Sequence, residues 1–336
     1  MTTPFGLDSL DPALESDLRE GLDAVEKRLA VAVQSADSFV AEAARHLIEA
    51  GGKRFRPLLT LLAAQFGDPH AEQVIDAAVV VELTHLATLY HDDVMDEAPL
   101  RRGAESANAR WGNSVAILTG DFLFARASDL LADLGPEAVR IQARTFEQLV
   151  TGQIRETVGP RGDEDPVSHY LNVVAEKTGS LIATSGLFGA KFADADPLHQ
   201  RVMERFGASI GVAFQLSDDV LDVASDSSES GKTPGTDLRE GVLTLPVLQA
   251  FAIDDRDARE IRALIGPDLA TVEAAEADDR VNRALEMLRA HEGMALARAE
   301  LHARAQAARD LLAPLPEGSA KDALAALADV VVSRSV

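Results

Sequence analysis

The sequence of 336 residues contains no cysteine. Disulfides, thiolate zinc sites and cysteine nucleophiles are therefore excluded. Aromatic residues make up only 4% of the chain although 46% of it is hydrophobic, so alanine, leucine and valine must build the core. That mixture favours helices over strands. Basic residues are also scarce, 32 against 55 acidic ones, and the net charge of −23 argues against binding nucleic acid through its phosphates.

Signals for export and membrane insertion are missing as well. Residues 1–11 contain neither a basic stretch nor an apolar one, so we see no signal peptide. No apolar run reaches the roughly 18 residues that cross a bilayer. We therefore expect a soluble cytoplasmic protein without a transmembrane segment.

Helical signals recur along the whole chain. Asp11 before Pro12 is typical of a helix N-terminus. Further helices are expected at 39–50 and 58–66, and glycine and proline separate later ones at 135–136, 159–166, 266–267 and 314–318. No alternating pattern predicts a strand, and no low-complexity linker marks a domain boundary. The sequence predicts an all-α protein with a single domain over residues 1–336.

An apolar stretch with helical spacing, residues 82–96, ends in three carboxylates. Asp92 and Asp96 are spaced i, i+4, so on a helix they share one face, and Asp93 follows Asp92 directly. Such carboxylates repel each other unless a cation or a proton lies between them. Oxygen ligands without cysteine suit a hard ion such as magnesium. Taken alone, the pattern fits a solvated acidic helix end equally well.

A second copy of this pattern lies at residues 211–222, where another apolar stretch ends in Asp218, Asp219 and Asp222. A buried run that ends in three acids requires cations. Two such helices facing each other would hold a cluster of divalent ions. The two clusters together predict a polyanionic ligand, a diphosphate.

Cations accompany both clusters. Lys53 and Arg56 follow a Gly-Gly break ahead of a helix, where backbone donors and cations can hold a phosphate, although such a fragment alone also fits two surface cations. Residues 225–238 form the longest irregular stretch and carry Lys232, and we interpret them as a mobile lid. His85 lies two helical turns before Asp92, a position that also suits an ordinary core histidine.

The motifs occur in a fixed order between residues 51 and 248. They are Gly51-Gly52-Lys53-Arg54-Phe55-Arg56-Pro57, His85, the first acidic cluster with Arg101-Arg102, Lys177-Thr178, Phe214-Gln215 with the second cluster, and Gly231-Lys232-x-x-Gly235-x-Asp237. The ordered set resembles the trans-isoprenyl diphosphate synthases, in particular the bacterial polyprenyl diphosphate synthases that make quinone side chains. The resemblance implies a helical bundle with the active-site cavity between core helices, and a homodimer. It also implies magnesium-dependent condensation of isopentenyl diphosphate with an allylic diphosphate such as farnesyl or geranylgeranyl diphosphate.

The resemblance also implies a role for each matching residue. Three magnesium ions would be held by Asp92, Asp96, Asp218 and Asp222, with Asp93 and Asp219 in support. The allylic diphosphate would be clamped by Arg101, Lys177 and Lys232. Isopentenyl diphosphate would be bound by Lys53, Arg56, His85 and Arg102. Oxygen dipoles would be directed at the developing allylic cation by Thr178 and Gln215. Many relatives have a lysine where this chain has Val242, so one supplementary cation is absent here unless Arg239 stands in for it.

Product length depends on the residues just before the first acidic cluster. Ala87 and Thr88 are small, whereas short-chain relatives carry an aromatic residue there. The resemblance therefore implies a product longer than geranylgeranyl diphosphate, and a transient membrane contact for its release. Alternatively, Phe122 or Phe124 closes the cavity and the product is short.

Two other functions fit parts of the pattern. A terpene cyclase also ionises an allylic diphosphate, but Lys53, Arg56 and His85 would then lack a role. Cyclases also line their cavities with aromatic rings, which are scarce in this chain. A non-catalytic subunit of a heteromeric synthase is a second alternative. Both acidic clusters are intact, which argues against it.

Overall fold

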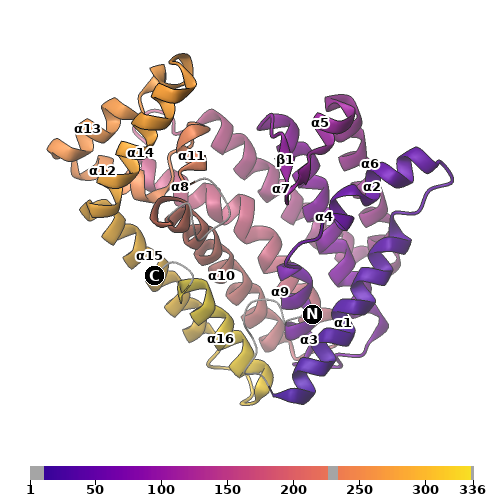
Figure 1. Cartoon of the computed structure of the whole chain (residues 1–336). Coiled ribbons are helices and arrows are strands. Elements are labelled where there is room, and N and C mark those ends of the chain that lie inside the picture. The colour runs from indigo at the N-terminus through magenta and orange to yellow at the C-terminus, as the bar shows by residue number, and fades with distance from the viewer. Residues whose placement is uncertain (1–10, 226–233, 334–336) are drawn as a thin grey trace. The chain divides into compact units, whose positions relative to one another are not determined.

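The computed structural model describes residues 11–225 and 234–333 (Figure 1). Helices predominate, and the all-α prediction is confirmed. Contacts divide the chain into two compact units: unit 1 (residues 1–149, 180–208 and 311–327) and unit 2 (150–179, 209–310 and 328–336). Both units include residues of α7 (Pro136–Val158), α10 (Pro197–Ala224) and α16 (Ser319–Ser333). The expectation of a single domain therefore stays a prediction.

Unit 1 begins with the helix that the sequence predicts. The side chain of Asp11 accepts hydrogen bonds from the backbone N–H of Ala13 and Leu14, at 3.0 and 3.2 Å, and Pro12 is the first helical residue. These contacts satisfy N–H groups that have no partner within the helix. This first helix is α1 (Pro12–Ala32). The other complete elements of the unit are α2 (Ser38–Glu49), α3 (Phe55–Ala64), α4 (Glu72–Met95), β1 (Leu100–Arg101), β2 (Ala104–Glu105), α5 (Ala107–Trp111), α6 (Asn113–Leu134) and α9 (Ser180–Phe192).

Helix α4 is the core of unit 1 and packs against α1, α3, α6 and α9. By length and composition this helix could cross a membrane, contrary to the expectation that no segment could. However, 67% of its most apolar stretch of 18 residues is buried inside the protein. Burial of an apolar helix on several sides is what a core position requires. The helix carries the first acidic cluster at its C-terminal end.

Two details of unit 1 differ from the sequence-based expectation. Helix α3 occupies Phe55–Ala64 rather than 58–66, because Pro57 is tolerated in a first turn that needs no N–H donor, and the chain after Ala64 tightens into i→i−3 hydrogen bonds. Strands β1 and β2 form a short antiparallel hairpin in which Arg101 pairs with Ala104, although no strand was predicted. The hairpin positions the two arginines that follow α4.

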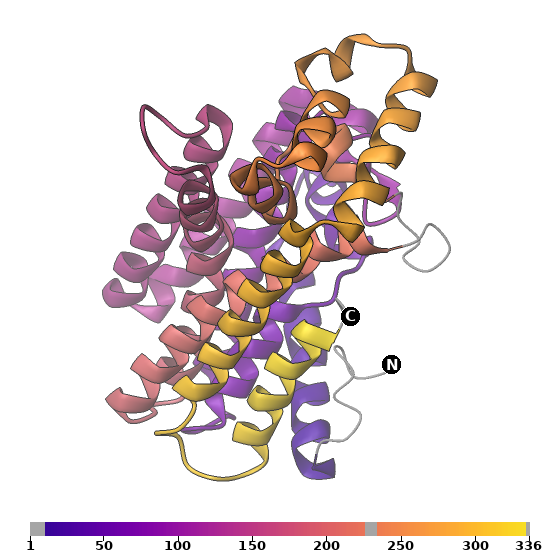
Figure 2. The ribbon, with the colours of Figure 1, turned by 90° about the vertical axis from the view of Figure 1, so that its left-hand side faces the viewer.

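Unit 2 holds the second acidic cluster on α10. Its other elements are α8 (Pro166–Val174), the π-helix η2 (Ala175–Gly179), α11 (Thr236–Arg239), α12 (Leu245–Ile253), α13 (Arg256–Leu264), the 3-10 helix η3 (Pro267–Thr271), α14 (Ala274–Ala290) and α15 (Glu292–Leu311). Helices α13 and α14 lie side by side in both ribbon views (Figures 1 and 2). The chain continues without interruption from η2 into α9. Residues 236–238 of the predicted lid belong to α11, and residues 226–233 lie outside the described residues.

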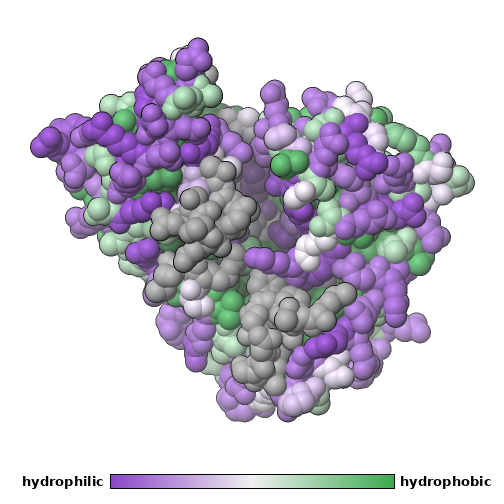
Figure 3. Space-filling view, viewed as in Figure 1, coloured by the Kyte–Doolittle hydropathy of each residue, from purple (hydrophilic) through white to green (hydrophobic). Residues whose placement is uncertain are grey.

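Hydrophilic side chains predominate on the face shown in Figure 3. Green, hydrophobic areas on this face are small and separate. The appearance agrees with the large excess of acidic residues in the sequence.

Candidate active site

The first acidic cluster lies at the C-terminal end of α4. Asp96 is the C-cap residue, and its N–H donates to the carbonyl oxygen of Asp92 at 2.8 Å. Exposed or half-buried side chains recur every three or four residues on one face of this part of the helix: His85, Thr88, Asp92 and Asp96. The predicted sharing of one helix face by Asp92 and Asp96 therefore agrees with the helical register.

Asp93 has a different environment from its neighbours. It is fully buried, and Arg101 donates from Nε to its Oδ1 at 2.5 Å. Its other oxygen, Oδ2, is buried without a hydrogen-bond partner among the described residues. Burial raises the pKa of Asp93, and Arg101 opposes that shift. Arg101 also approaches Asp96 at 4.0 Å, so one guanidinium links two members of the cluster.

The Gly-Gly break before α3 is a tight loop. Gly51 and Gly52 have φ of 84° and 150°, and Arg54 is left-handed at φ 50°. A Cβ on Gly52 would lie only 2.9 Å from Cζ of Arg102, so the absence of a side chain lets the arginine approach. Arg102 donates to the carbonyl oxygens of Leu47, at 3.0 Å, and Gly51. The hairpin thus holds the end of α2 through Arg102.

Arg54, which the sequence analysis did not single out, is the buried cation of this loop. Its guanidinium bonds to Glu26 on α1, to Glu82 on α4 at 3.0 Å, and to the carbonyl oxygen of Ile48 at 3.2 Å. Burial lowers its pKa, but the two glutamates outweigh burial and the net shift is upward. No local sequence signal distinguishes Arg54 from Arg56, because its partners lie 28 residues away on either side.

Arg56 is in the opposite situation. Its guanidinium has no hydrogen-bond or ion-pair partner within residues 11–225 and 234–333, and its Nε is buried. Burial lowers the pKa of Arg56 to about 10, with Glu82 opposing and Arg102 adding to the shift. The pKa of His85 lies well below its usual range. Burial is the main cause, and the positive charges of Arg56, Arg102, Arg54 and Arg101 lower it further. A neutral imidazole and several cations therefore gather beside α4, while Lys53 is exposed on the same loop.

In unit 2, Asp219 is the buried member of the second cluster. Gln215 donates from Nε2 to its Oδ1 at 3.0 Å, and the hydroxyl of Tyr170 donates to its Oδ2. Burial raises the pKa of Asp219 well above its usual range, and Asp237, Asp222 and Glu156 add to the shift. Like Asp93 in the first cluster, Asp219 is the second aspartate of its motif and the inaccessible one.

Asp222 binds the chain that follows the predicted lid. Its carboxylate accepts from the N–H of Thr236 at 3.0 Å and from that of Asp237 at 3.2 Å. Arg239, the expected substitute for a missing lysine, donates instead to Asp278 on α14 at 2.9 Å and to backbone carbonyls beside α11. The start of α11 is therefore fixed to α10, and Arg239 is engaged by α14.

Lys177 and Thr178 lie in the π-helix η2. Lys177 Nζ contacts Glu156 Oε2 on α7 at 2.5 Å, and the hydroxyl of Thr178 donates to Gln215 Oε1 at 3.3 Å. A π-helical turn inside a helical region is rare and frequent at functional sites. Gln215 connects this turn to Asp219. Glu156 and Tyr170 were not predicted from the sequence, because their neighbouring residues show no distinctive motif.

The polyprenyl synthetase family matches residues 37–284, which is most of the chain. The chain belongs to the polyprenyl synthetase family. It is 50% identical to the nonaprenyl diphosphate synthase of Mycobacterium tuberculosis over 335 residues, 99% of this chain and 98% of that protein. The predicted family and enzyme class, a transferase of isoprenoid biosynthesis, are confirmed.

Solved structures of synthetases agree with the fold. A geranylgeranyl pyrophosphate synthase from Corynebacterium glutamicum, complexed with calcium and isoprenyl diphosphate, has a TM-score of 0.85 and 49% identity and covers 97% of this chain and 98% of its own. A decaprenyl diphosphate synthase from Rhodobacter capsulatus has a TM-score of 0.86 and 32% identity, with 96% and 99% coverage. These relatives differ in the product that their names give.

For a polyprenyl synthetase the metal site is the central expectation. The first acidic cluster belongs to unit 1 and the second to unit 2, so the shared magnesium cluster stays a prediction. Among the described residues, no three histidine, aspartate or glutamate side chains form a ready-made metal site. A magnesium site needs only one or two carboxylates when substrate phosphates and waters complete it. Lys232 lies outside the described residues.

The two residues expected to set the product length of this synthetase have different environments. Ala87 is fully buried, and its carbonyl oxygen is 3.1 Å from where a Cβ on Gly120 of α6 would stand. Thr88 is half-buried on the same face as Asp92, and its hydroxyl donates to the carbonyl oxygen of His85 at 2.7 Å. Their role in product length stays a prediction. Thr88 is better placed than Ala87 to limit the product, because it lies on the half-buried face that carries Asp92.

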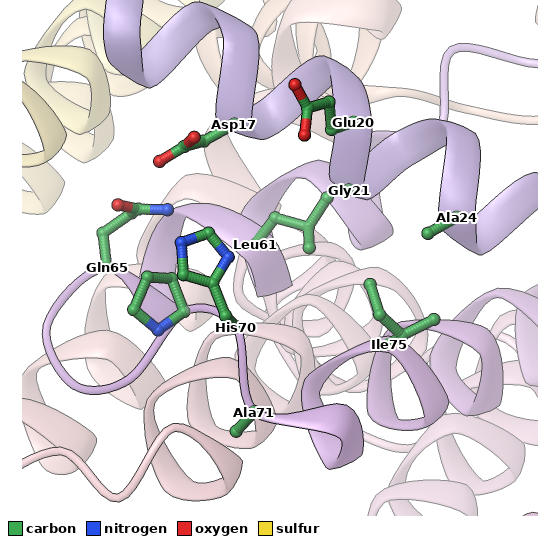
Figure 4. A pocket seen from close by; sticks show the side chains of 10 residues that line it. Asp17, Glu20, Gly21, Ala24, Leu61, Gln65, His70, Ala71 and Ile75 are labelled. Atoms are coloured by element: carbon green, nitrogen blue, oxygen red, sulfur yellow. The ribbon is translucent and has the colours of Figure 1, made fainter.

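A pocket of about 210 Å³ in unit 1 lies apart from these residues of the synthetase (Figure 4). It is lined by ten residues: Asp17, Glu20, Gly21, Ala24, Leu61, Gln65, Pro69, His70, Ala71 and Ile75. None of the predicted site residues lines it. The motif chemistry therefore does not involve this pocket.

Proposed function

We propose that this synthetase condenses isopentenyl diphosphate with an allylic diphosphate, such as farnesyl or geranylgeranyl diphosphate, and repeats the step to give an all-trans product longer than geranylgeranyl diphosphate. The observation that carries the proposal is the guanidinium of Arg56, which has no partner among the described residues although its Nε is buried. A charged group placed this way requires an anionic partner. Arg102 and the neutral His85 lie in the same cluster and supply further donors for a diphosphate.

The donor chemistry fits a hard divalent ion. The accessible or half-buried members of the two clusters, Asp92, Asp96, Asp218 and Asp222, offer only carboxylate oxygens, which magnesium prefers. We assign three magnesium ions to these four residues. Bound ions of this kind stabilise the negative charge of a leaving diphosphate.

The protein's own groups position the two substrates. Isopentenyl diphosphate is held by Lys53, Arg56, His85 and Arg102, and the allylic diphosphate by Arg101, Lys177 and Lys232. Thr178 and Gln215, which are hydrogen-bonded to each other, direct oxygen dipoles at the allylic carbon as it becomes positive. Positioning of the alkene next to that carbon favours its attack over that of water. The departing diphosphate takes the proton, so no side-chain base is assigned.

The test uses the purified chain with magnesium, isopentenyl diphosphate and farnesyl diphosphate, and reads product length by mass spectrometry. A product longer than geranylgeranyl diphosphate supports the proposal, and a geranylgeranyl product contradicts its length. A cyclic hydrocarbon indicates a terpene cyclase, and no turnover without a partner chain indicates a non-catalytic subunit.

Arg56→Gln tests the observation on which the proposal rests. We expect the KM for isopentenyl diphosphate to rise by about tenfold or more, since a charge-assisted contact is lost, with the KM for the allylic substrate little changed. Arg201→Gln, at an exposed arginine of α10, is the matched control. An unchanged KM in Arg56→Gln removes this arginine from the diphosphate site.

We also propose a cytoplasmic homodimer that contacts the membrane transiently to release its product. Support for the dimer comes from α6, where Ile117 and Leu118 are 42% and 65% exposed. Contact with a second copy would remove this apolar surface from water, which favours association.

A further inference from the structure

Glu82 on α4 is a buried acid in the middle of the arginine cluster. It is only 2% exposed and lies three residues, about one turn, before His85. The motif analysis assigned it no role. A carboxylate is rarely buried in an apolar helix unless it is paired, and Glu82 accepts a hydrogen bond from Nη1 of Arg54 at 3.0 Å.

Arg54 connects Glu82 to the loop that carries the predicted ligands. Besides Glu82 it binds the carbonyl oxygen of Ile48 at 3.2 Å, and on its other side it binds Glu26. Ile48 belongs to the last turn of α2, and Arg54 is itself the N-cap residue of α3. One guanidinium therefore ties the end of α2 and the start of α3 to α4.

We propose that Glu82 is a positioning residue for the isopentenyl diphosphate site: by holding Arg54 it orients the loop of residues 51–56 and the guanidinium of Arg56. The inference rests on the proposed function, because it assumes that Arg56 binds this substrate. Glu82 itself does not touch the substrate in this assignment.

The charges show why one acid matters here. Burial lowers the pKa of three arginines, Arg54, Arg56 and Arg102. The negative charge of Glu82 lies near enough to all three to oppose this effect. Glu26, whose side chain is 44% exposed, binds Arg54 from the side of α1 and also stabilises Arg102, but its charge does not act on Arg56. Without Glu82, no acid offsets the burial of Arg56 and its repulsion by Arg102.

Arg56 is the group most easily displaced by that repulsion. Arg102 is held by the carbonyl oxygens of Leu47 and Gly51, and Arg54 by Glu26 and Ile48. The guanidinium of Arg56 has no hydrogen bond among the described residues. A misplaced guanidinium loses its two-point contact with a phosphate, which depends on geometry.

The test compares Glu82→Gln with Glu26→Gln. Both variants replace a glutamate that pairs with Arg54 by a neutral amide of the same shape. For Glu82→Gln we expect the KM for isopentenyl diphosphate to rise by about tenfold or more and the KM for the allylic diphosphate to stay within about twofold. For Glu26→Gln both constants should stay within about twofold, because the charge of Glu26 does not act on Arg56. A general loss of structure would raise both constants together, and that outcome overturns the inference.

A double variant tests the route through Arg54. Arg54→Gln removes the same tie from its other side, so we expect its KM for isopentenyl diphosphate to rise about as much as in Glu82→Gln. Because the two residues act through one contact, Arg54→Gln/Glu82→Gln should be no more impaired than either single variant. A double variant in which the two effects multiply overturns the positioning route. If Glu82→Gln does not fold, Glu82→Asp is the second variant. It keeps the carboxylate but holds it farther from Arg54, because the side chain is one methylene shorter. Only the KM for isopentenyl diphosphate should rise.

The outcomes separate this inference from the proposed function. A wild-type chain that makes no polyprenyl product contradicts the proposed function itself. An active wild type whose KM for isopentenyl diphosphate is unchanged by Glu82→Gln contradicts only the role of Glu82. Thermal unfolding of each variant, followed by circular dichroism, shows whether loss of stability accompanies the kinetic change.

Discussion

Arg101 Nε lies 2.5 Å from Asp93 Oδ1, and Asp93 has no exposed surface. The middle acid of the first cluster therefore orients an arginine, while Asp92 and Asp96 keep surface on the accessible face of α4. The second cluster shows the same division, since Asp219 binds Gln215 and Tyr170. In each motif the buried aspartate organises its neighbours.

This division predicts the effect of Asp93→Asn, which keeps the shape of the side chain and removes its charge. Arg101 loses its partner, and we expect kcat/KM for the allylic diphosphate to fall by roughly 10- to 100-fold, because an arginine clamp depends on its orientation. Asp129→Asn, on the exposed surface of α6, is the control. Steady-state kinetics with each substrate varied in turn measures the effect. Wild-type kinetics in Asp93→Asn would show that Arg101 needs no orientation by Asp93.

The accessible aspartates are expected to act on turnover. Asp92→Ala, Asp96→Ala and Asp218→Ala should each lower kcat by roughly 10³-fold, because each removes a ligand that stabilises charge in the transition state. Helical content measured by circular dichroism should stay unchanged, as in the control Asp133→Ala on α6. Single-turnover rates at saturating magnesium provide the measurement. Near-normal turnover in Asp218→Ala would contradict a site built from both clusters.

The pKa of Arg56 predicts proton uptake on binding. In the free protein the pKa is about 10, below the usual 12.5, so part of the population is deprotonated at high pH. An anion bound to Arg56 raises the pKa again, so Arg56 should take up a fraction of a proton on binding at pH 9.5, and this contribution should disappear near pH 7. Calorimetric titration with isopentenyl diphosphate in two buffers of different ionisation enthalpy measures this number. Uptake that persists in Arg56→Gln would assign the proton to another group.

Product length is expected to depend on Thr88. A phenylalanine there places a ring on the half-buried face one turn before Asp92, and we expect shorter products with the first condensation largely retained. Ala87→Phe is less suitable, because Ala87 is fully buried against α6 and overpacking would destabilise the protein by about 1–3 kcal/mol. Mass spectrometry of the products decides the point. Identical product lengths in wild type and Thr88→Phe would leave Phe122 or another residue as the limit.

Assembly is expected to depend on α6. Ile117→Asp with Leu118→Asp places two charges on the exposed apolar surface, and light scattering should then show a monomer where the wild type is a dimer. Val31→Asp, at a residue of α1 that is 49% exposed, is the matched control. A wild-type chain that is a stable, fully active monomer would remove the dimer proposal.

Local patterns in the chain were enough to predict the helical class and several helix ends. Asp11 with Pro12, and the Gly and Pro pairs such as Gly135-Pro136, act within one turn of the chain, so their effect is visible without the fold. The spacing of Asp92 and Asp96 has the same local character, since helix geometry alone places both on one face. The hairpin at Leu100–Glu105 and the π-helix at Ala175–Gly179 were not predicted, because each is too short to show a periodic pattern.

Which of two neighbouring arginines is structural depends on long-range packing and could not be predicted from their motif. Arg54 and Arg56 stand two residues apart in one motif, yet Arg54 is bound by Glu26 and Glu82 while the guanidinium of Arg56 has no partner among the described residues. The same holds for Asp92 and Asp93, which differ in burial and not in type. Adjacent positions on a helix or loop point in different directions, and ion-pair partners come from segments remote in sequence. The role of each charge is therefore decided by long-range packing.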